Sequence, residues 1–192
     1  MDLTHDLKPR MALLPALLAA LALAAIVALG PGAARGEAAQ CAAAGTPAYK
    51  LSREAARKAT LCAINVEREH RGLRPLRFDD HQQKAAARHN RIMVEKRCFS
   101  HQCAGERDLV GRFIAAGYLP CNCYWAVAEN IAWGVGGTST PRSIVNAWMK
   151  SSAHRINILN PRFDEAGVGV NRGSPEGGGQ AATFTMDFGF KG

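Results

Sequence analysis

The sequence predicts an α+β domain in which helices pack on a small antiparallel sheet. Residues 52–96 and 140–149 carry apolar side chains at helical spacing, whereas residues 166–170 and 183–188 alternate with the period of a strand. The length of 192 residues allows one domain, and a charged fraction of 21% is ordinary for a globular chain. Disordered, collagen-like and coiled-coil classes are therefore excluded.

The first 35 residues have the pattern of a secretory signal peptide. Lys8 and Arg10 precede an uncharged apolar run at residues 11–29, which small residues follow. A transmembrane anchor is the alternative, because about 20 apolar residues can span a bilayer. A lipoprotein signal fits poorly, since Gln40 stands before Cys41. We expect a signal at 1–35, an N-terminal arm or linker at 36–50 and a folded domain at 51–192.

Two helices are expected first. One begins near Ser52 and ends at Gly72, and an extended stretch follows because Pro75 biases the residue before it away from helix. The second helix starts after Asp79, an N-cap residue with a glutamine three positions later, and runs to about Lys96.

The remaining elements are shorter. Residues 109–114 predict a short helix that ends at Gly117, and residues 126–139 are interpreted as a glycine-rich connector. Thr140 as N-cap, with proline at the first helical position, opens another helix. A short helical turn follows Ser151, and the two alternating segments near the C-terminus predict a hairpin.

Six cysteines beyond the signal predict three disulfides in an oxidising compartment, and they are Cys41, Cys62, Cys98, Cys103, Cys121 and Cys123. Chain order suggests that Cys41 pairs with Cys62. We expect the other four to pair among themselves, with links from the Cys121 and Cys123 pair to Cys98 and Cys103, because a bridge within Cys121-x-Cys123 is strained. A zinc knot of these four is the alternative, although the spacing lacks the usual C-x2-C pairs.

The net charge of +8 favours anionic surfaces such as cell-wall polymers or lipid headgroups. Basic residues are scattered along the first helix and the segment after it, which indicates a solvated face. An exported protein seldom meets nucleic acid, so no nucleic-acid partner is expected. After signal cleavage the chain is not expected to be an integral membrane protein.

Two histidines and one acid are candidates for chemistry. His101 lies in the cysteine-rich loop, His154 starts a helical turn, and Glu129 is a lone acid between apolar residues. Together they can hold a zinc ion or another divalent metal with an open position, or share proton transfer. His89 is interpreted as a packed helix residue. Motifs for a serine nucleophile, a phosphate-binding loop and an H-E-x-x-H metal site are absent from the sequence.

Six blocks of sequence, taken together and in order, resemble the CAP superfamily of cysteine-rich secretory proteins, antigen 5 (allergen V5/Tpx-1-related) and pathogenesis-related 1 proteins. The similarity is to the bacterial SCP-like extracellular branch and covers about residues 55–190. The blocks are residues 61–68 (LCAINVER), 72–76 (GLRPL), 99–101 (FSH), 115–118 (AAGY), 129–132 (ENIA) and 148–159 (WMKSSAHRINIL).

The resemblance implies an α-β-α sandwich with a small central sheet and a large cleft lined by histidines and acids. His101 and Glu129 match the first histidine and glutamate of that cleft, and His154 matches the histidine of the H-R-x-N-I-L block. The second glutamate of animal members has no counterpart after Trp148. Asp187 stands where a polar cleft residue is expected.

A binding or interaction module at the cell envelope is the function that these features favour, because the fold match comes without a convincing nucleophile. The first alternative is a hydrolase in which a metal on His101 and His154 activates water, with Glu129 as base or ligand. The second is a lipid or sterol carrier with an apolar groove near Tyr124, Trp125 and Trp133.

Overall fold

The structure is a computed structural model that describes residues 41–120 and 123–192. The predicted signal at 1–35 and the start of the arm lie outside the described residues. Within them, no helix is long and apolar enough to cross a membrane. The arm contributes two short 3-10 turns, η1 (Ala42–Gly45) and η2 (Ala48–Lys50), and the predicted disulfide Cys41–Cys62 joins it to the first described helix.

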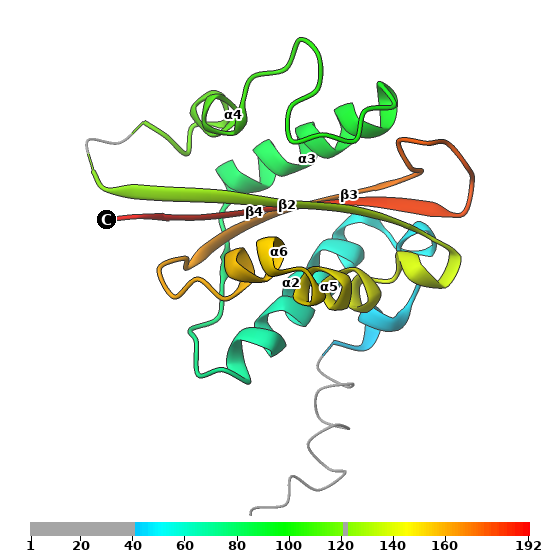
Figure 1. Ribbon diagram of the computed structural model, residues 1–192, viewed down its shortest axis with the longest axis horizontal. Coiled ribbons are helices and arrows are strands. Elements are labelled where there is room, and N and C mark those ends of the chain that lie inside the picture. Colours follow the sequence, from blue (N-terminus) through cyan, green and yellow to red (C-terminus); the bar gives the residue numbers. More distant parts are fainter. Residues whose placement is uncertain (1–40, 121–122) are drawn as a thin grey trace, which may run out of the picture.

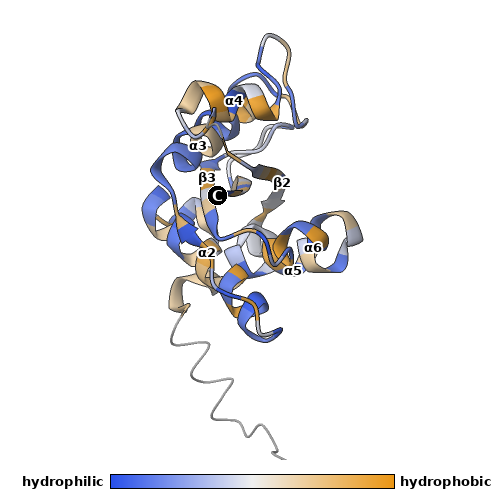
Figure 2. Ribbon diagram, turned by 90° about the vertical axis from the view of Figure 1, so that its left-hand side faces the viewer, coloured by the Kyte–Doolittle hydropathy of each residue, from blue (hydrophilic) through white to orange (hydrophobic). Residues whose placement is uncertain are grey.

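Helices cover both faces of one mixed sheet (Figure 1). Helices α3 (Asp80–Glu95) and α4 (Leu109–Ala116) lie on one side, and α2 (Arg53–Glu69), α5 (Pro141–Lys150) and α6 (Ser152–Ile158) lie on the other. This arrangement confirms the α+β sandwich. Polar and apolar residues share the helices, as amphipathic packing on a sheet requires (Figure 2).

The sheet has the order β1-β3-β4-β2. Strands β3 (Glu165–Arg172) and β4 (Ala181–Lys191) form the predicted antiparallel hairpin, and β2 (Trp125–Val135) pairs antiparallel with β4. The two-residue β1 (Arg77–Phe78) pairs in parallel with the start of β3. The central sheet is therefore antiparallel apart from this short edge strand.

The prediction of a connector at 126–139 was wrong, because most of it is β2. On the side of α5 and α6, β2 presents Ala126, Ala128 and Ala132, which pack on the main core. Its other face carries the buried polar Glu129. The face that carries Glu129 is otherwise apolar, and the alanines make the opposite face largely apolar too. With Glu129 and Asn130 adjacent in the middle, the polar–apolar alternation that marks a half-buried strand is absent.

The predicted helix ends are confirmed by their caps. The side chain of Asp79 accepts hydrogen bonds from the backbone N–H groups of His81 and Gln82, and Thr140 accepts from Ser143. Gly117 ends α4 with φ of 91°, a left-handed conformation that glycine adopts without steric cost.

The predicted links from the Cys121 and Cys123 pair to Cys98 and Cys103 were wrong, because Cys98 is bonded to Cys103. The chain reverses directly after α3, where Arg97 has a φ of 51°, and this reversal brings the two Cα atoms within 5.9 Å. The bond also excludes a zinc knot of all four thiolates. Cys123 is also disulfide-bonded, and Cys121 lies outside the described residues.

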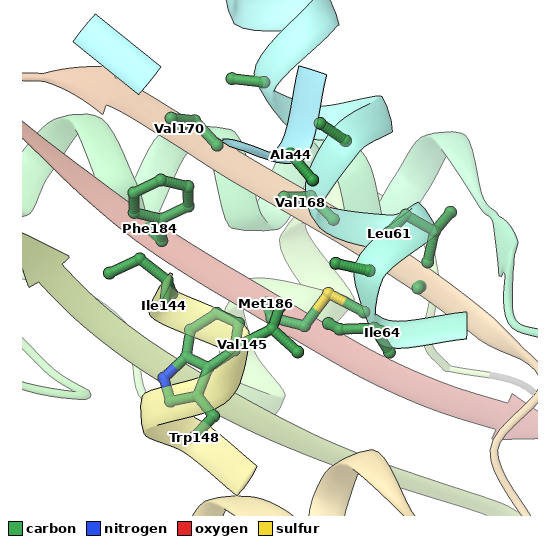
Figure 3. Packing of buried hydrophobic residues seen from close by; sticks show 14 of the residues in the cluster. Ala44, Leu61, Ile64, Ile144, Val145, Trp148, Val168, Val170, Phe184 and Met186 are labelled. Atoms are coloured by element: carbon green, nitrogen blue, oxygen red, sulfur yellow. The ribbon is translucent and has the colours of Figure 1, made fainter. Parts of the chain in front are cut away.

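The two faces of the sheet differ in polarity. Toward α2 and α5, Phe184 and Met186 of β4 join Trp148, Ile64 and Val168 in the main hydrophobic core (Figure 3). The alternate residues of β4, Thr185 and Asp187 among them, are also buried. Because side chains alternate along a strand, these polar groups face α3 instead.

Close contact between α3 and β3 depends on glycine. A Cβ atom at Gly167 would lie 2.2 Å from the backbone carbonyl carbon of Gln82, which no real contact allows. We expect Gly167→Ala to lower the free energy of unfolding by about 2 kcal/mol, because α3 has to move off the sheet. Urea unfolding measures this, with Gly179→Ala in open space as the control. Equal losses in the two variants would contradict it.

Candidate functional site

His101 and Glu129 form a hydrogen-bonded pair at the polar face of the sheet. The Nδ1 atom of His101 lies 2.7 Å from Oε1 of Glu129. The His101 side chain is 60% exposed, whereas that of Glu129 is 1% exposed. An ionised carboxylate can only accept, so Nδ1 carries the proton and the Nε2 atom is left for other partners. The pair therefore consists of a solvent-exposed imidazole that is held by a buried carboxylate.

Three elements position this pair. Glu129 lies in β2 directly opposite Asp187 of β4, so the two side chains share the face of the sheet toward α3. His101 lies in the loop between α3 and α4, which the Cys98–Cys103 disulfide closes two residues beyond it. The sequence placed Glu129 in a loop, but the strand register is what aims its carboxylate at His101.

Arg112 of α4 holds both members of the pair. Its Nη2 donates to Oε2 of Glu129 at 2.5 Å, and its Nη1 donates to the backbone carbonyl of His101 at 2.6 Å. The Arg112 side chain is 4% exposed. A charge-assisted hydrogen bond in a buried setting is strong and directional. Arg112 therefore fixes the carboxylate and the loop at once.

A second histidine and a second acid lie behind the pair. The Nδ1 atom of His89 lies 2.8 Å from Oε2 of Glu106, and its Nε2 lies 3.7 Å from Oε2 of Glu129. Both His89 and Glu106 have nearly inaccessible side chains. His89 thus lies between two carboxylates on the inner face of α3.

Sequence reasoning missed His89, Glu106 and Arg112 as site residues. For two of them the sequence holds an indication of a buried role. His89 lies on the apolar face of α3 near Met93, and Arg112 lies beside Phe113 in an otherwise apolar short helix. A charged or titratable residue in a buried stripe requires a buried partner. The partners of His89 and Arg112 lie in other elements, and the sequence around those partners does not indicate the contact.

Asp187 is fully buried, and neither of its carboxylate oxygens has a hydrogen-bond partner among the described residues. Burial raises the pKa of Asp187 well above its usual value, and the neighbouring negative charge of Glu129 raises it further. Both effects favour the neutral, protonated form of Asp187. Asp187 is the strand neighbour of Glu129, and its expected role as a cleft residue stays a prediction.

His154 lies in α6, which contacts β2 beside Glu129. The side chain of Asn130 donates to the backbone carbonyl of His154 at 3.0 Å, and Asn157 donates to Asn130 at 2.9 Å. These amide contacts pin α6 to β2 next to Glu129. The His154 side chain is half-buried, and burial followed by the charge of His101 lowers its pKa. Within the described part of the chain, no hydrogen bond restrains its ring.

Protonation determines when the His101 pair is an ion pair. The hydrogen bond to Glu129 raises the pKa of His101 above 6.5, although partial burial opposes it. Burial alone would raise the pKa of Glu129, but His101, His89 and Arg112 outweigh it and lower that pKa below 4.5. The stabilisation from His101 is complete below its unfolded pKa and lost as pH rises through the folded value. That from Glu129 is lost as pH falls through its own lowered pKa.

We expect Glu129→Gln to lower the pKa of His101. The variant removes the negative acceptor that favours the imidazolium and keeps Arg112, whose positive charge opposes it. Proton NMR titration of the His101 ring measures the change. The matched control is Glu176→Gln, an exposed acid in the turn between β3 and β4, which should leave the titration unchanged. A His101 titration unaffected by Glu129→Gln would contradict the coupling.

The side chains present fit a protein-held metal centre poorly. Across residues 41–120 and 123–192, no group of three or more histidine, cysteine, aspartate and glutamate side chains is arranged to hold a metal ion. Both oxygens of Glu129 are already bound, one by His101 and one by Arg112. The predicted metal role of His101 and His154 stays a prediction.

The aromatic residues predicted for a lipid groove lie at or near β2. Tyr124 is 86% exposed, and Trp125 begins β2 with 40% exposure. Trp133 is half-buried near the opposite end of the same strand. The three therefore do not gather at one point, and a lipid groove there stays a prediction.

Comparison with known proteins identifies relatives that this chain matches over part of their length. The chain is 39% identical over 114 residues to the uncharacterized protein YkwD of Bacillus subtilis (strain 168), a match that covers 57% of this chain and 40% of that protein. It is similar in fold to an extracellular protein containing a SCP domain from Bacillus anthracis str. Ames, with a TM-score of 0.59 and 24% identity. That match covers 73% of this chain and 42% of the other.

A cysteine-rich secretory protein from Staphylococcus aureus subsp. aureus Mu50 is also similar, with a TM-score of 0.52 and 17% identity over 71% of this chain and 38% of that one. The chain thus spans less than half the length of these three relatives. The model of the CAP family, described as the cysteine-rich secretory protein family, matches residues 61–188. Since that span holds every element from most of α2 to β4, the chain belongs to the CAP family.

Proposed function

We propose that this chain is an extracellular CAP-domain binding protein of the cell envelope, and that the site around His101 and Glu129 contacts its ligand. Export is supported by the pattern of residues 1–35 and by disulfides, which persist in oxidising compartments. The net charge of +8 supports an anionic partner such as a wall polymer.

The main observation behind this proposal is the hydrogen bond between the exposed imidazole of His101 and the buried carboxylate of Glu129. Glu129 and Arg112 hold the ring in one orientation, so little side-chain freedom remains to be lost on binding. Because the pKa of His101 is raised, the ring keeps its positive charge to higher pH than a free imidazole, and in this form it can donate from Nε2 to a ligand carboxylate. A carboxylate-bearing wall polymer such as peptidoglycan fits this chemistry.

Binding of the purified full-length chain to isolated peptidoglycan tests the proposal. We expect saturable binding that weakens at least tenfold in His101→Gln, because the oriented donor is removed. Binding should also weaken as pH rises through the pKa of His101. The matched control is His70→Gln at the exposed end of α2. Equal binding by the wild type and both variants would refute a role for His101.

A hydrolase is the second candidate, and the same pair favours it. A histidine oriented by a buried carboxylate can take a proton from water as a general base. Release of soluble fragments from peptidoglycan measures such an activity. It should rise with pH through the pKa of His101 and be lost in His101→Gln but not in His70→Gln. Binding without release of fragments would leave the binding function alone.

A further inference from the structure

A groove with basic walls crosses the outer edge of the sheet beside β3. Strand β1 pairs only with Glu165 and Ala166, and at Val168 the side-chain amide of Gln83 exchanges two hydrogen bonds with the strand. Beyond that point the groove opens over Val170, with a volume of about 420 Å³. An adjoining hollow of about 500 Å³ shares Val170 and reaches Arg172. The two hollows adjoin, since they share Arg53, Val170 and Asn171.

The walls carry five cations and no acid. Arg53 and Arg57 come from α2, and Lys84, Arg88 and Arg91 come from α3. Helices α2 and α3 lie on opposite sides of the sheet, so only the folded chain brings these charges together (Figure 1). None of the residues that line this groove belongs to the His101 site.

Four of the five cations have no carboxylate within ion-pair distance among the described residues. Arg91 alone is paired, with Glu95 at 3.7 Å, and both side chains are well exposed. Cations elsewhere on or near α2 are neutralised locally: Lys58 lies 2.7 Å from Glu54, and Arg71, just beyond the helix, lies 2.8 Å from Glu67. Apart from Arg91, the cations of the groove are therefore uncompensated within the described chain.

This arrangement costs helix stability. Arg53 and Arg57 are four residues apart on α2, and Lys84 and Arg88 are four apart on α3, a spacing at which like charges repel. Arg53 also stands in the first turn of α2, where the helix dipole disfavours a cation. An anion lying between the two helices would relieve all three repulsions.

We propose that this groove binds a linear polymer of phosphate groups. Four of the five cations are arginines, whose planar guanidinium groups bind phosphate oxygens in pairs. The two adjoining hollows offer room for successive phosphates of one chain. No aromatic side chain lines either hollow, so the groove offers no surface for stacking nucleic-acid bases. Recognition rests on the phosphate backbone alone.

Calorimetric titration of the full-length chain with linear inorganic polyphosphate tests the proposal. The groove variant is Arg57→Gln/Arg88→Gln. The matched control is Arg142→Gln/Lys150→Gln, which removes the same charge from exposed positions on α5. We expect at least tenfold weaker binding in the groove variant. The slope of log K against log salt should become shallower by about 1.4, as for the loss of two phosphate contacts.

Circular dichroism verifies that each variant remains folded. Equal weakening in the groove and control variants would overturn the proposal, because it would mean that net charge alone attracts the polymer. Absence of wild-type binding at millimolar polyphosphate would overturn it too. Equally tight binding of poly-glutamate with the same charge would overturn the preference for phosphate. His101→Gln should leave polyphosphate binding unchanged, so this result is separable from the test of the His101 site.

Discussion

Arg68→Met is expected to lower the free energy of unfolding by about 4 kcal/mol, among the largest losses that a single substitution can cause in this chain. Arg68 is fully buried in α2. Its guanidinium donates to four backbone carbonyls, those of Arg74, Ile158, Asn160 and Phe163, at 2.8 to 3.0 Å. Methionine fills similar volume but leaves these buried acceptors without donors.

The effect reaches beyond α2, because Arg68 ties that helix to the segment between α6 and β3. Urea unfolding at pH 7 measures the loss. Arg71→Met is the matched control: Arg71 is exposed and pairs with Glu67 one turn away, so less than about 1 kcal/mol should be lost. Arg68→Lys should recover only part of the stability, since one ammonium cannot reach four carbonyls. A loss below 1 kcal/mol in Arg68→Met would contradict this account.

Arg112→Met is expected to cost about 3 kcal/mol at pH 7, because it leaves the buried carboxylate of Glu129 without its closest cation. The loop that carries His101 also loses its anchor, since Arg112 donates to the His101 carbonyl. Removing one partner of a buried pair is costly even where the intact pair contributes little net stability.

The second effect of Arg112→Met should be on the titration of His101, whose pKa should rise further without the positive charge of Arg112. Urea unfolding and an NMR titration of His101 measure the two effects. Arg107→Met, in the exposed loop five residues earlier, should change neither. Unaltered stability in Arg112→Met would mean that Glu129 is neutral in the fold.

Local features of the chain were predictable where their causes are local. The caps at Asp79, Thr140 and Gly117 depend on residues within three positions of the helix end. The hairpin of β3 and β4 shows its alternation because one face of β4 is apolar throughout. Strand β2 was missed because both of its faces are largely apolar and the polar Glu129 and Asn130 are adjacent, so polar and apolar residues do not alternate.

Only part of the candidate site was predictable from the sequence. His101, Glu129 and His154 stand in irregular or polar settings that draw attention, and the family resemblance singles out the same residues. Arg112 and His89 do not, because each looks like one more helical residue until its partner is known. The Cys98–Cys103 pairing depended on a chain reversal after α3, which spacing alone did not reveal.

By itself, the sequence determined the fold class, the helix ends, the hairpin and the family, because each follows from propensities and patterns within a few residues or from the order of blocks along the chain. Only the tertiary structure decided which charges meet. Glu129 is joined to Arg112, His89 and His101 by strand register and helix packing, and Arg57 is brought beside Arg88 across the sheet edge. Electrostatic interaction depends on the distance between charges in space, and the sequence alone does not give that distance for residues that lie far apart along the chain.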